Sequence, residues 1–344
     1  MQRPVGLIRQ AWLFPTLATT LALVAAGWAA PSMAQSPAPS GSAAVLGPSG
    51  VVEAGTCPGL FDGLCSTVAV GVWDRVPYTP PIECGAGGTT GTLCQLQMEI
   101  SAPTSGGPWP IVVMEVGGPA DPGDLFTSAF GPFAAALAGQ GAVVMVSGWR
   151  QADIFGGGYP TSFEDVACAV GVARQTGPAY GGDPQRVILA GHSNGGWPAM
   201  VLGLTPTPFT PATGSCDPTS SSLRPDAAVS MSGAIDLVNV PYDDPGYIDS
   251  FMGGDQATSP DAWAAADPFA LVQRYPAGAD AIPFLIIHGA LDRSVLPAGS
   301  ESFQAALVAA GYHSRLLIIE SATHLQTLHG RVSIDAIVAL AASL

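Results

Sequence analysis

The chain has 344 residues, with 11 arginines, no lysine and 26 acidic side chains, so its formal net charge is −15 at pH 7. The absence of lysine excludes Schiff-base chemistry and a Walker-type phosphate loop, because both need a lysine amine. The acidic balance argues against a nucleic-acid partner, since phosphate contacts depend on Lys and Arg.

The N-terminal residues 1–34 have the pattern of an export signal. Two arginines precede an apolar run over 11–30, and small residues at Ser32 and Ala34 offer a cleavage site. The apolar run is long, so a retained membrane anchor is the alternative interpretation. After cleavage we expect a secreted or periplasmic protein that is not stably inserted in a membrane.

The segment 35–50 is rich in Pro, Ser and Gly, which is typical of a disordered lead-in. We expect residues 51–344 to form a single catalytic domain. Short strand-like runs between Gly and Pro turns over 51–110 predict antiparallel strands.

The pattern changes at Ile111, where continuous apolar runs begin to alternate with helix-length stretches. The runs are "IVVMEV", "AVVMVS", "RVILA", "DAAVSMS", "PFLIIHG" and "SRLLII". This alternation predicts an α/β fold with a mostly parallel central sheet flanked by helices on both faces. Segments 204–225 and 238–280 fit it poorly, and we expect them to form a small, loop-rich cap or pocket insertions.

The six cysteines agree with export to an oxidising compartment. Proximity along the chain suggests the pairs Cys57–Cys65 and Cys84–Cys94, which leaves Cys168–Cys216. The spacings typical of zinc ligands are absent, so we expect no metal, and no organic cofactor is implied.

The run "GHSNGG" at 191–196 follows a strand-like segment and precedes a helix-compatible one. In this context Gly-x-Ser-x-Gly predicts a nucleophile elbow, a tight turn that exposes the hydroxyl of Ser193. The glycines Gly191 and Gly195 are needed because side chains would collide with neighbouring backbone in so sharp a turn.

A serine hydroxyl needs a base, and the chain has five histidines. His192 lies inside the elbow and is expected to point away from the hydroxyl, while His288 is expected to support its own loop. His313 precedes the last strand, at the opposite end of the sheet. We favour His324, directly beyond that strand, over His329 further on.

The orienting acid is expected between the serine and the base, at the end of another strand. Asp292 meets this requirement because it follows the run "PFLIIHG". Asp236 and Glu320 are the alternatives. An acid in this position holds the imidazole tautomer and stabilises the imidazolium.

An oxyanion hole requires backbone N–H groups that converge on the developing negative charge. Asn194, the residue after the serine, is one expected donor. The loop after "IVVMEV" is expected to supply the other from Gly118, with Gly117 in reserve, because Pro119 has no N–H.

Aromatic residues near the elbow are candidates for a substrate pocket, namely Trp149, Tyr159 and Trp197. Glu115 is a lone carboxylate in an apolar strand and must be paired or protonated, with Arg150 as a possible partner.

The segments "GYPTSFEDVACAVGVARQTGPAYGGDPQRVILAGHSNGG", "PFLIIHGALDRSVLP" and "ATHLQTL" resemble the α/β-hydrolase superfamily. Within it they are similar to carboxylesterases of the hormone-sensitive-lipase and feruloyl-esterase-like groups, over about residues 95–344. The resemblance implies a Ser193–His324–Asp292 triad and ester hydrolysis through an acyl-enzyme. Such esterases usually carry His-Gly-Gly-Gly at the oxyanion loop, whereas this chain has Val116 and Pro119 at the first and last positions.

The leading hypothesis is an exported serine hydrolase acting on small-molecule or polymeric carboxylic esters. A hydrolase of β-diketone C–C bonds in polymer-derived substrates, a peptidase and an acyltransferase use the same triad. A non-catalytic binding protein on this scaffold is the alternative from another class. The acyl and alcohol groups and the oligomeric state stay open.

Overall fold

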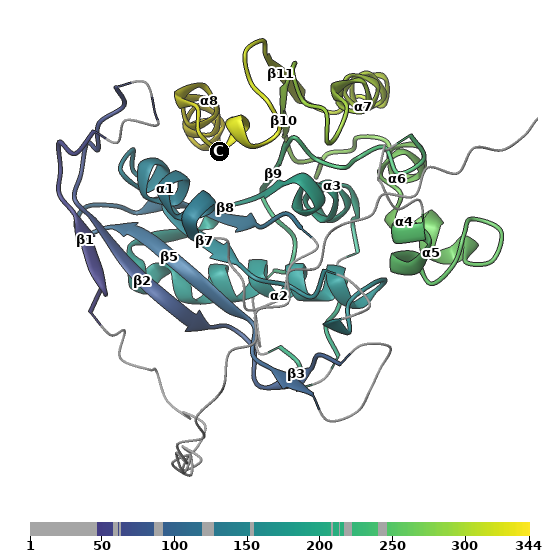
Figure 1. Ribbon diagram of the computed structural model, residues 1–344, viewed down its shortest axis with the longest axis horizontal. Helices are drawn as coiled ribbons and strands as arrows, with labels where there is room; N and C mark the ends of the chain where they lie inside the picture. Colours follow the sequence, from purple (N-terminus) through teal and green to yellow (C-terminus); the bar gives the residue numbers. More distant parts are fainter. Residues whose placement is uncertain are drawn as a thin grey trace, which may run out of the picture. The chain divides into compact units, whose positions relative to one another are not determined.

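A nine-stranded sheet forms the centre of the structure (Figure 1). The computed structural model describes residues 47–57, 61, 63–85, 92–118, 127–151, 155–207, 209–212, 214–216, 222–239 and 246–344. All of them belong to one compact unit, Val45–Leu344. The expected export signal and most of the expected lead-in lie outside the described residues.

The strand order is β1-β2-β5-β7-β6-β8-β9-β10-β11. Three antiparallel strands come first, β1 (Gly50–Val52), β2 (Val70–Pro77) and β5 (Gln97–Pro103). The other six are mutually parallel: β7 (Val143–Ser147), β6 (Trp109–Glu115), β8 (Gly182–His192), β9 (Ala227–Met231), β10 (Phe284–Gly289) and β11 (Ser314–Ile319). A separate two-stranded sheet pairs β3 (Ile82–Glu83) with β4 (Leu93–Cys94).

Helices cover the sheet on both faces (Figure 1). One face carries α1 (Thr127–Ala138) and α8 (Arg331–Ala341). The other carries α2 (Thr161–Thr176), α3 (Gly196–Leu204) and α7 (Pro297–Ala309). Short 3-10 helices lie at η4 (Gly177–Tyr180), η5 (Ser193–Gly195) and η6 (Leu325–Thr327).

The central strands have continuous apolar sequences because both of their faces are covered. Every residue of β7, β9 and β10 is buried. A parallel sheet inside two helical layers needs this composition, since no strand face meets water. The predicted fold class is therefore confirmed, with the antiparallel strands at the N-terminal side of the sheet.

The segment 238–280 contains three short helices where it is described. They are α4 (Gly246–Met252), α5 (Pro260–Ala266) and α6 (Pro268–Arg274). The start of α6 has a local cause, because the Asp267 carboxylate accepts a hydrogen bond from Phe269 N–H and Pro268 is the first helical residue. This segment is thus more helical than the loop-rich cap that the sequence predicts.

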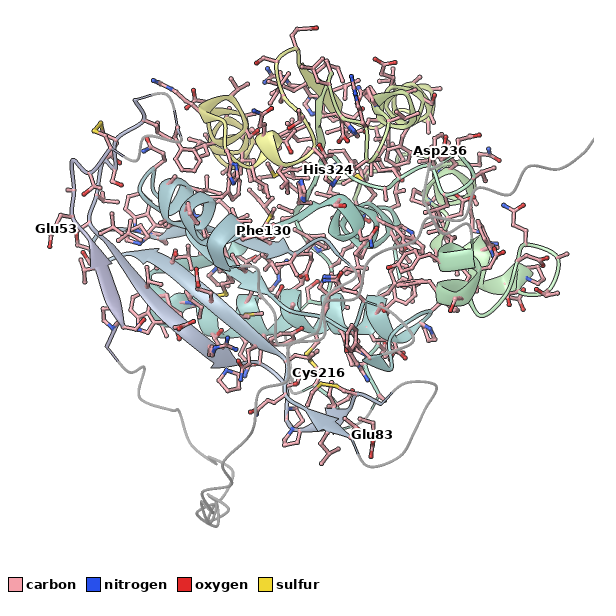
Figure 2. All side chains as sticks on the ribbon, viewed as in Figure 1. Glu53, Glu83, Phe130, Cys216, Asp236 and His324 are labelled. Atoms are coloured by element: carbon pink, nitrogen blue, oxygen red, sulfur yellow. A yellow bond between two sulfur atoms is a disulfide. The ribbon has the colours of Figure 1, made fainter. Side chains whose placement is uncertain are left out.

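Three disulfides join the same pairs that proximity in the chain suggests, and no described cysteine is free. The Cys84–Cys94 bond closes the β3–β4 hairpin. The Cys168–Cys216 bond ties α2 to the 204–225 segment, and Figure 2 labels Cys216 near α2.

Glu115 lies at the end of β6 and is completely buried. Ser147, its neighbour in the register of β7, donates a 2.7 Å hydrogen bond to Glu115 Oε1, and Oε2 has no hydrogen-bond partner. The expectation of an Arg150 partner is wrong, because Arg150 lies beyond the end of β7 and pairs with Asp165 of α2. Burial raises the pKa of Glu115 well above its ordinary value, and the Ser147 hydrogen bond only partly opposes this.

The Glu115→Gln variant is expected to be more stable than the wild type at alkaline pH. A carboxyl whose folded-state pKa is raised stabilises the fold below its unfolded pKa, and this contribution is lost as pH rises through the folded pKa. The loss is at most about 1.4 kcal/mol per pH unit, and glutamine does not ionise.

Urea denaturation at several pH values between about 5 and about 9 measures this effect. The difference between variant and wild type should grow with pH, while Glu301→Gln at an exposed position of α7 should show no such trend. A difference that stays constant with pH contradicts the raised pKa.

Candidate active site

Ser193 lies in the sharp turn between β8 and α3. Its φ angle is +55°, a left-handed conformation that is strained for a non-glycine residue and is typical of a nucleophile elbow. A methyl group at Gly191 would lie 1.9 Å from the Gly195 carbonyl oxygen, and one at Gly195 would lie 2.4 Å from the Glu115 carbonyl oxygen. Both glycines are therefore required by backbone packing around the serine.

His324 and Asp292 meet at the carboxyl ends of the last two strands. His324 Nδ1 is 2.7 Å from Asp292 Oδ2, and the Asp292 side chain is fully buried. Asp292 Oδ1 accepts hydrogen bonds from the N–H groups of Ser294 at 2.9 Å and Val295 at 3.0 Å. The carboxylate is thus held in one orientation toward the imidazole.

The alternative base and acids do not take part in this contact. His329 makes no side-chain hydrogen bond to another described residue, and Glu320 is exposed. Asp236, labelled in Figure 2 with His324, accepts hydrogen bonds from Asn239 instead. Geometry therefore favours the pair of His324 and Asp292.

A second imidazole shares the Asp292 carboxylate. His288 is completely buried, and its Nε2 lies 3.2 Å from Asp292 Oδ2 and 2.9 Å from the Val295 carbonyl oxygen. That nitrogen carries a proton, because a carbonyl only accepts. Its Nδ1 lies 2.7 Å from Ser300 Oγ.

Opposing effects set the pKa of Asp292. Burial raises it, but the hydrogen bonds from His288, His324 and the Val295 N–H lower it by more. The net pKa lies well below its usual range. The carboxylate is thus ionised at neutral pH.

His192 connects the elbow to the loop that carries His324. Its side chain is buried, its Nε2 lies 3.0 Å from the His324 carbonyl oxygen, and the two ring centres are 4.7 Å apart. Burial, with a smaller effect of His324, lowers the pKa of His192 to about 3, so the ring is neutral and donates from Nε2. The sequence gives this residue no role, because the contact spans 132 positions of the chain.

The loop 116–118 lies directly against the serine. A methyl group at Gly117 would come within 2.7 Å of Ser193 Cβ. In the described part of the chain, the N–H groups of Gly117 and Gly118 donate no hydrogen bond. The Asn194 side chain donates to the Gly118 carbonyl oxygen and so ties this loop to the elbow.

The segment after β7 forms hydrogen bonds with the loop 116–118. Trp149 Nε1 donates to the Val116 carbonyl oxygen at 3.1 Å, and Gln151 Nε2 donates to the Val116 and Gly117 carbonyl oxygens at 3.3 and 3.4 Å. Between these two residues, Arg150 makes a buried, bidentate contact with Asp165 of α2. The loop 116–118 is therefore held by residues on either side of Arg150, which is itself bound to a helix on the sheet face.

Tyr247 of α4 links the 238–280 segment to the site. Its hydroxyl accepts a hydrogen bond from Asn194 Nδ2 at 3.1 Å and donates one to the Gln151 carbonyl oxygen at 3.0 Å. Sequence reasoning missed this residue, because nothing in its local pattern indicates a partner so far along the chain.

Two of the three aromatic residues expected to line a substrate pocket are instead buried in the core. Trp149 and Trp197 are 0% and 1% exposed, and Trp197 donates to the Ala266 carbonyl oxygen at 2.7 Å, so both are core residues. Trp197 is part of α3, which covers the sheet, and Trp149 lies just after the buried strand β7. Tyr159 is partly exposed and packs edge-on against Phe163 and Phe209.

Three further observations concern the described residues. Ser193 Oγ makes no hydrogen bond to His324 or to any other described side chain in this geometry, and such contacts often form only with bound substrate. Among the same residues, no cluster of His, Cys, Asp or Glu is suited to a metal ion. In that part of the chain, no helix combines the length and apolarity needed to cross a membrane.

The sheet order, the elbow and the loops around it define an α/β-hydrolase fold. The BD-FAE family model matches residues 98–307, more than half of the chain. The chain therefore belongs to the BD-FAE family of α/β-hydrolase-type esterases. No curated protein matches it.

Several solved esterases are similar in structure. Native esterase 2 of Thermogutta terrifontis has a TM-score of 0.57 at 23% identity, over 78% of this chain and 91% of that one. A truncated carbohydrate esterase from gut microbiota has a TM-score of 0.60 at 16% identity, over 78% and 96%.

A bifunctional GH43-CE protein of Bacteroides eggerthii has a TM-score of 0.59 at 21% identity over 72% of this chain. The matched region is 33% of that protein, so this chain corresponds to about a third of it. At these identities the likeness shows the fold alone.

The His192→Gln variant is expected to lose stability less steeply in acid than the wild type. The folded-state pKa is about 3, whereas the unfolded value is about 6.5. Between these values the unfolded state binds the extra proton, so stability falls as pH falls, by at most about 1.4 kcal/mol per unit.

Urea unfolding at pH values from about 7 to about 4.5 measures this slope. The matched control is His313→Gln, which replaces an exposed imidazole and should keep the slope of the wild type. Parallel curves for His192→Gln and the wild type would show that His192 is not kept neutral by burial.

Proposed function

We propose that the chain is a serine hydrolase that cleaves carboxylic esters through Ser193, His324 and Asp292. The observation that carries this proposal is the 2.7 Å contact between His324 Nδ1 and Asp292 Oδ2, in a loop bound to the elbow of Ser193. A carboxylate on Nδ1 leaves Nε2 as the basic nitrogen, which is the arrangement that activates a serine hydroxyl.

The reaction follows from these positions. Ser193 Oγ attacks the ester carbonyl carbon and passes its proton to His324 Nε2, while the Asp292 carboxylate stabilises the imidazolium. The N–H groups of Gly117 or Gly118 and of Asn194 receive the oxyanion. The tetrahedral intermediate then expels the alcohol, which takes the proton from His324, and water releases the acid from Ser193 by the same steps.

Family membership favours ester cleavage over the other reactions that use this triad. Peptide cleavage, acyl transfer and cleavage of β-diketone C–C bonds need the same three residues, so the triad alone does not separate them. Two similar structures carry the name carbohydrate esterase or GH43-CE, which supports small or polymeric esters as substrates. A non-catalytic scaffold is disfavoured because nucleophile, base and acid are all present.

Replacing Ser193 or Asp292 is expected to abolish or strongly lower ester hydrolysis. We expect kcat/KM for p-nitrophenyl esters, acetate to palmitate, to fall by at least about 10³-fold in Ser193→Ala and by about 10³- to 10⁴-fold in Asp292→Asn. The control Ser105→Ala changes an exposed serine without a side-chain hydrogen bond and should retain wild-type rates.

Covalent labelling gives a readout that does not depend on the choice of ester. Thermogutta terrifontis esterase 2 has been solved phosphonylated by cyclosarin. A fluorophosphonate should add its mass to the peptide that contains Ser193, and only when Ser193 is intact. Labelling without activity on any ester redirects the search to peptides and β-diketones, whereas no labelling contradicts an activated serine.

We also propose that the enzyme is exported and loses its N-terminal segment. The three disulfides support an oxidising compartment, and residues 1–34 have the sequence of a cleavable signal. Expressed in a Gram-negative host, the full chain should yield a periplasmic or secreted protein whose N-terminal sequence starts near Gln35. A full-length chain recovered in the membrane fraction would favour a retained anchor.

A further inference from the structure

The hydroxyl of Tyr247 joins two residues that lie far apart in the chain. It accepts a hydrogen bond from Asn194 Nδ2 at 3.1 Å and donates one to the Gln151 carbonyl oxygen at 3.0 Å. Tyr247 belongs to α4, in the segment between β9 and β10, whereas Asn194 lies in the turn after β8 and Gln151 follows β7. A side chain from the inserted helical segment thus connects two of the loops at the proposed site.

Both partners of this hydroxyl also contact the loop 116–118. The Asn194 side chain donates to the Gly118 carbonyl oxygen. Gln151 Nε2 donates to the first two carbonyl oxygens of the loop, at 3.3 and 3.4 Å. Starting and ending at this loop, the hydrogen bonds form a closed chain through Asn194, Tyr247 and Gln151, which we call the Tyr247 network.

The network acts on the peptide groups that carry two of the proposed oxyanion donors. The carbonyl oxygens of Val116 and Gly117 belong to the same peptides as the N–H groups of Gly117 and Gly118, and both peptides are trans. In a planar trans peptide the C=O and N–H point in opposite directions, so a hydrogen bond to the carbonyl also fixes the direction of the N–H. Gln151 therefore contributes to the orientation of both N–H groups, and its own main chain is bound by Tyr247.

The position of the Tyr247 hydroxyl is itself fixed by the packing of α4. Tyr247 and Phe251 lie one helical turn apart, with ring centres at 6.3 Å. Phe251 is buried against Trp197 of α3, with ring centres 4.6 Å apart (Figure 1). The Phe251 carbonyl oxygen also accepts a 2.7 Å hydrogen bond from the Tyr159 N–H. The helix that carries Tyr247 is thus attached to the core.

The hydroxyl is suited to hold other groups and not to transfer a proton. A tyrosine hydroxyl has a single hydrogen to donate, and that of Tyr247 is bound to the Gln151 carbonyl oxygen. In this geometry it does not protonate the leaving alcohol of an ester.

We propose that Tyr247 is a positioning residue for the oxyanion hole, and that its hydroxyl acts through its two hydrogen-bond partners on the loop 116–118. Donors that are already held in place need no rearrangement when negative charge develops in the transition state. Loss of the hydroxyl therefore lowers the rate of the chemical step and leaves the affinity for the ester nearly unchanged. This inference rests on the proposed function.

The first experiment compares p-nitrophenyl acetate hydrolysis by the wild type and by Tyr247→Phe, which loses the hydroxyl and keeps the ring. We expect kcat to fall by roughly ten- to hundredfold, less than or equal to the loss of a complete oxyanion donor, and KM to stay within about twofold.

The matched control is Tyr312→Phe. It also removes a tyrosine hydroxyl that donates to a main-chain carbonyl oxygen, that of Tyr275, but it lies before β11, at the other end of the sheet. This variant should retain the wild-type kcat. If Tyr247→Phe does not fold, Asn194→Ala removes the other end of the same hydrogen bond, keeps the backbone N–H, and should show the same loss of kcat at unchanged KM.

A trifluoromethyl ketone inhibitor distinguishes positioning of the oxyanion hole from a general structural role. Ser193 Oγ adds to the ketone carbon, the serine proton passes to His324, and the ketone oxygen becomes an oxyanion. Because this adduct resembles the tetrahedral intermediate, its inhibition constant should rise in Tyr247→Phe by about the factor by which kcat/KM falls.

A double-variant cycle tests whether the hydroxyl acts through Asn194. In Tyr247→Phe/Asn194→Ala, the loss of kcat should be smaller than the product of the two single losses, because both changes break the same hydrogen bond.

Four results would each overturn the proposal. They are a kcat of Tyr247→Phe equal to that of Tyr312→Phe, a loss confined to KM, an unchanged inhibition constant, and losses that multiply fully in the double variant. Failure of the proposed function gives a different result, because the wild type then hydrolyses no ester or Ser193→Ala retains the activity.

Discussion

The close contact between the elbow and the end of β6 is the constraint on which the rest of the site depends. Gly195 packs so tightly on the Glu115 carbonyl that a single methyl group would lie 2.4 Å from its oxygen. Ser193, in the same turn, has a φ angle of +55°, and the loop that follows Glu115 lies so close that a methyl group at Gly117 would be 2.7 Å from Ser193 Cβ. The turn that carries Ser193 and the loop after β6 are therefore positioned together by backbone packing, and the hydrogen bond from the Asn194 side chain to the Gly118 carbonyl oxygen also joins them.

Three histidines form hydrogen bonds around Asp292 and the loop that carries His324. Asp292 receives hydrogen bonds from both His288 and His324, so its carboxylate has little freedom to rotate. His192, buried and neutral, binds the backbone of His324 from within the elbow itself. A hydrogen bond thus joins the turn that carries Ser193 to the loop that carries His324. The three imidazole rings differ in the groups that their nitrogens contact.

Local patterns predicted the fold class, which the structure confirms, and a candidate triad, which stays a prediction. Continuous apolar runs predicted the parallel strands because both faces of those strands are covered, and the glycines around Ser193 predicted a sharp turn after a strand. His324 and Asp292 were proposed from their places after strands, since the carboxyl ends of parallel strands share one edge, and their side chains are in contact in the structure. Trp149 and Trp197 were misassigned to a pocket, because aromatic residues near a site look alike in sequence whether they face a cavity or the core.

The sequence by itself determined the parallel strands of the core and the sharp turn at Ser193, because each of these depends on neighbours along the chain. Only the tertiary structure decided the partners of the buried polar groups. Glu115 accepts a hydrogen bond from Ser147 instead of pairing with Arg150, and the Tyr247 hydroxyl accepts one from the Asn194 side chain. These hydrogen bonds depend on the register between strands and on contacts between loops that are far apart in the chain. A local sequence pattern contains no information about such contacts.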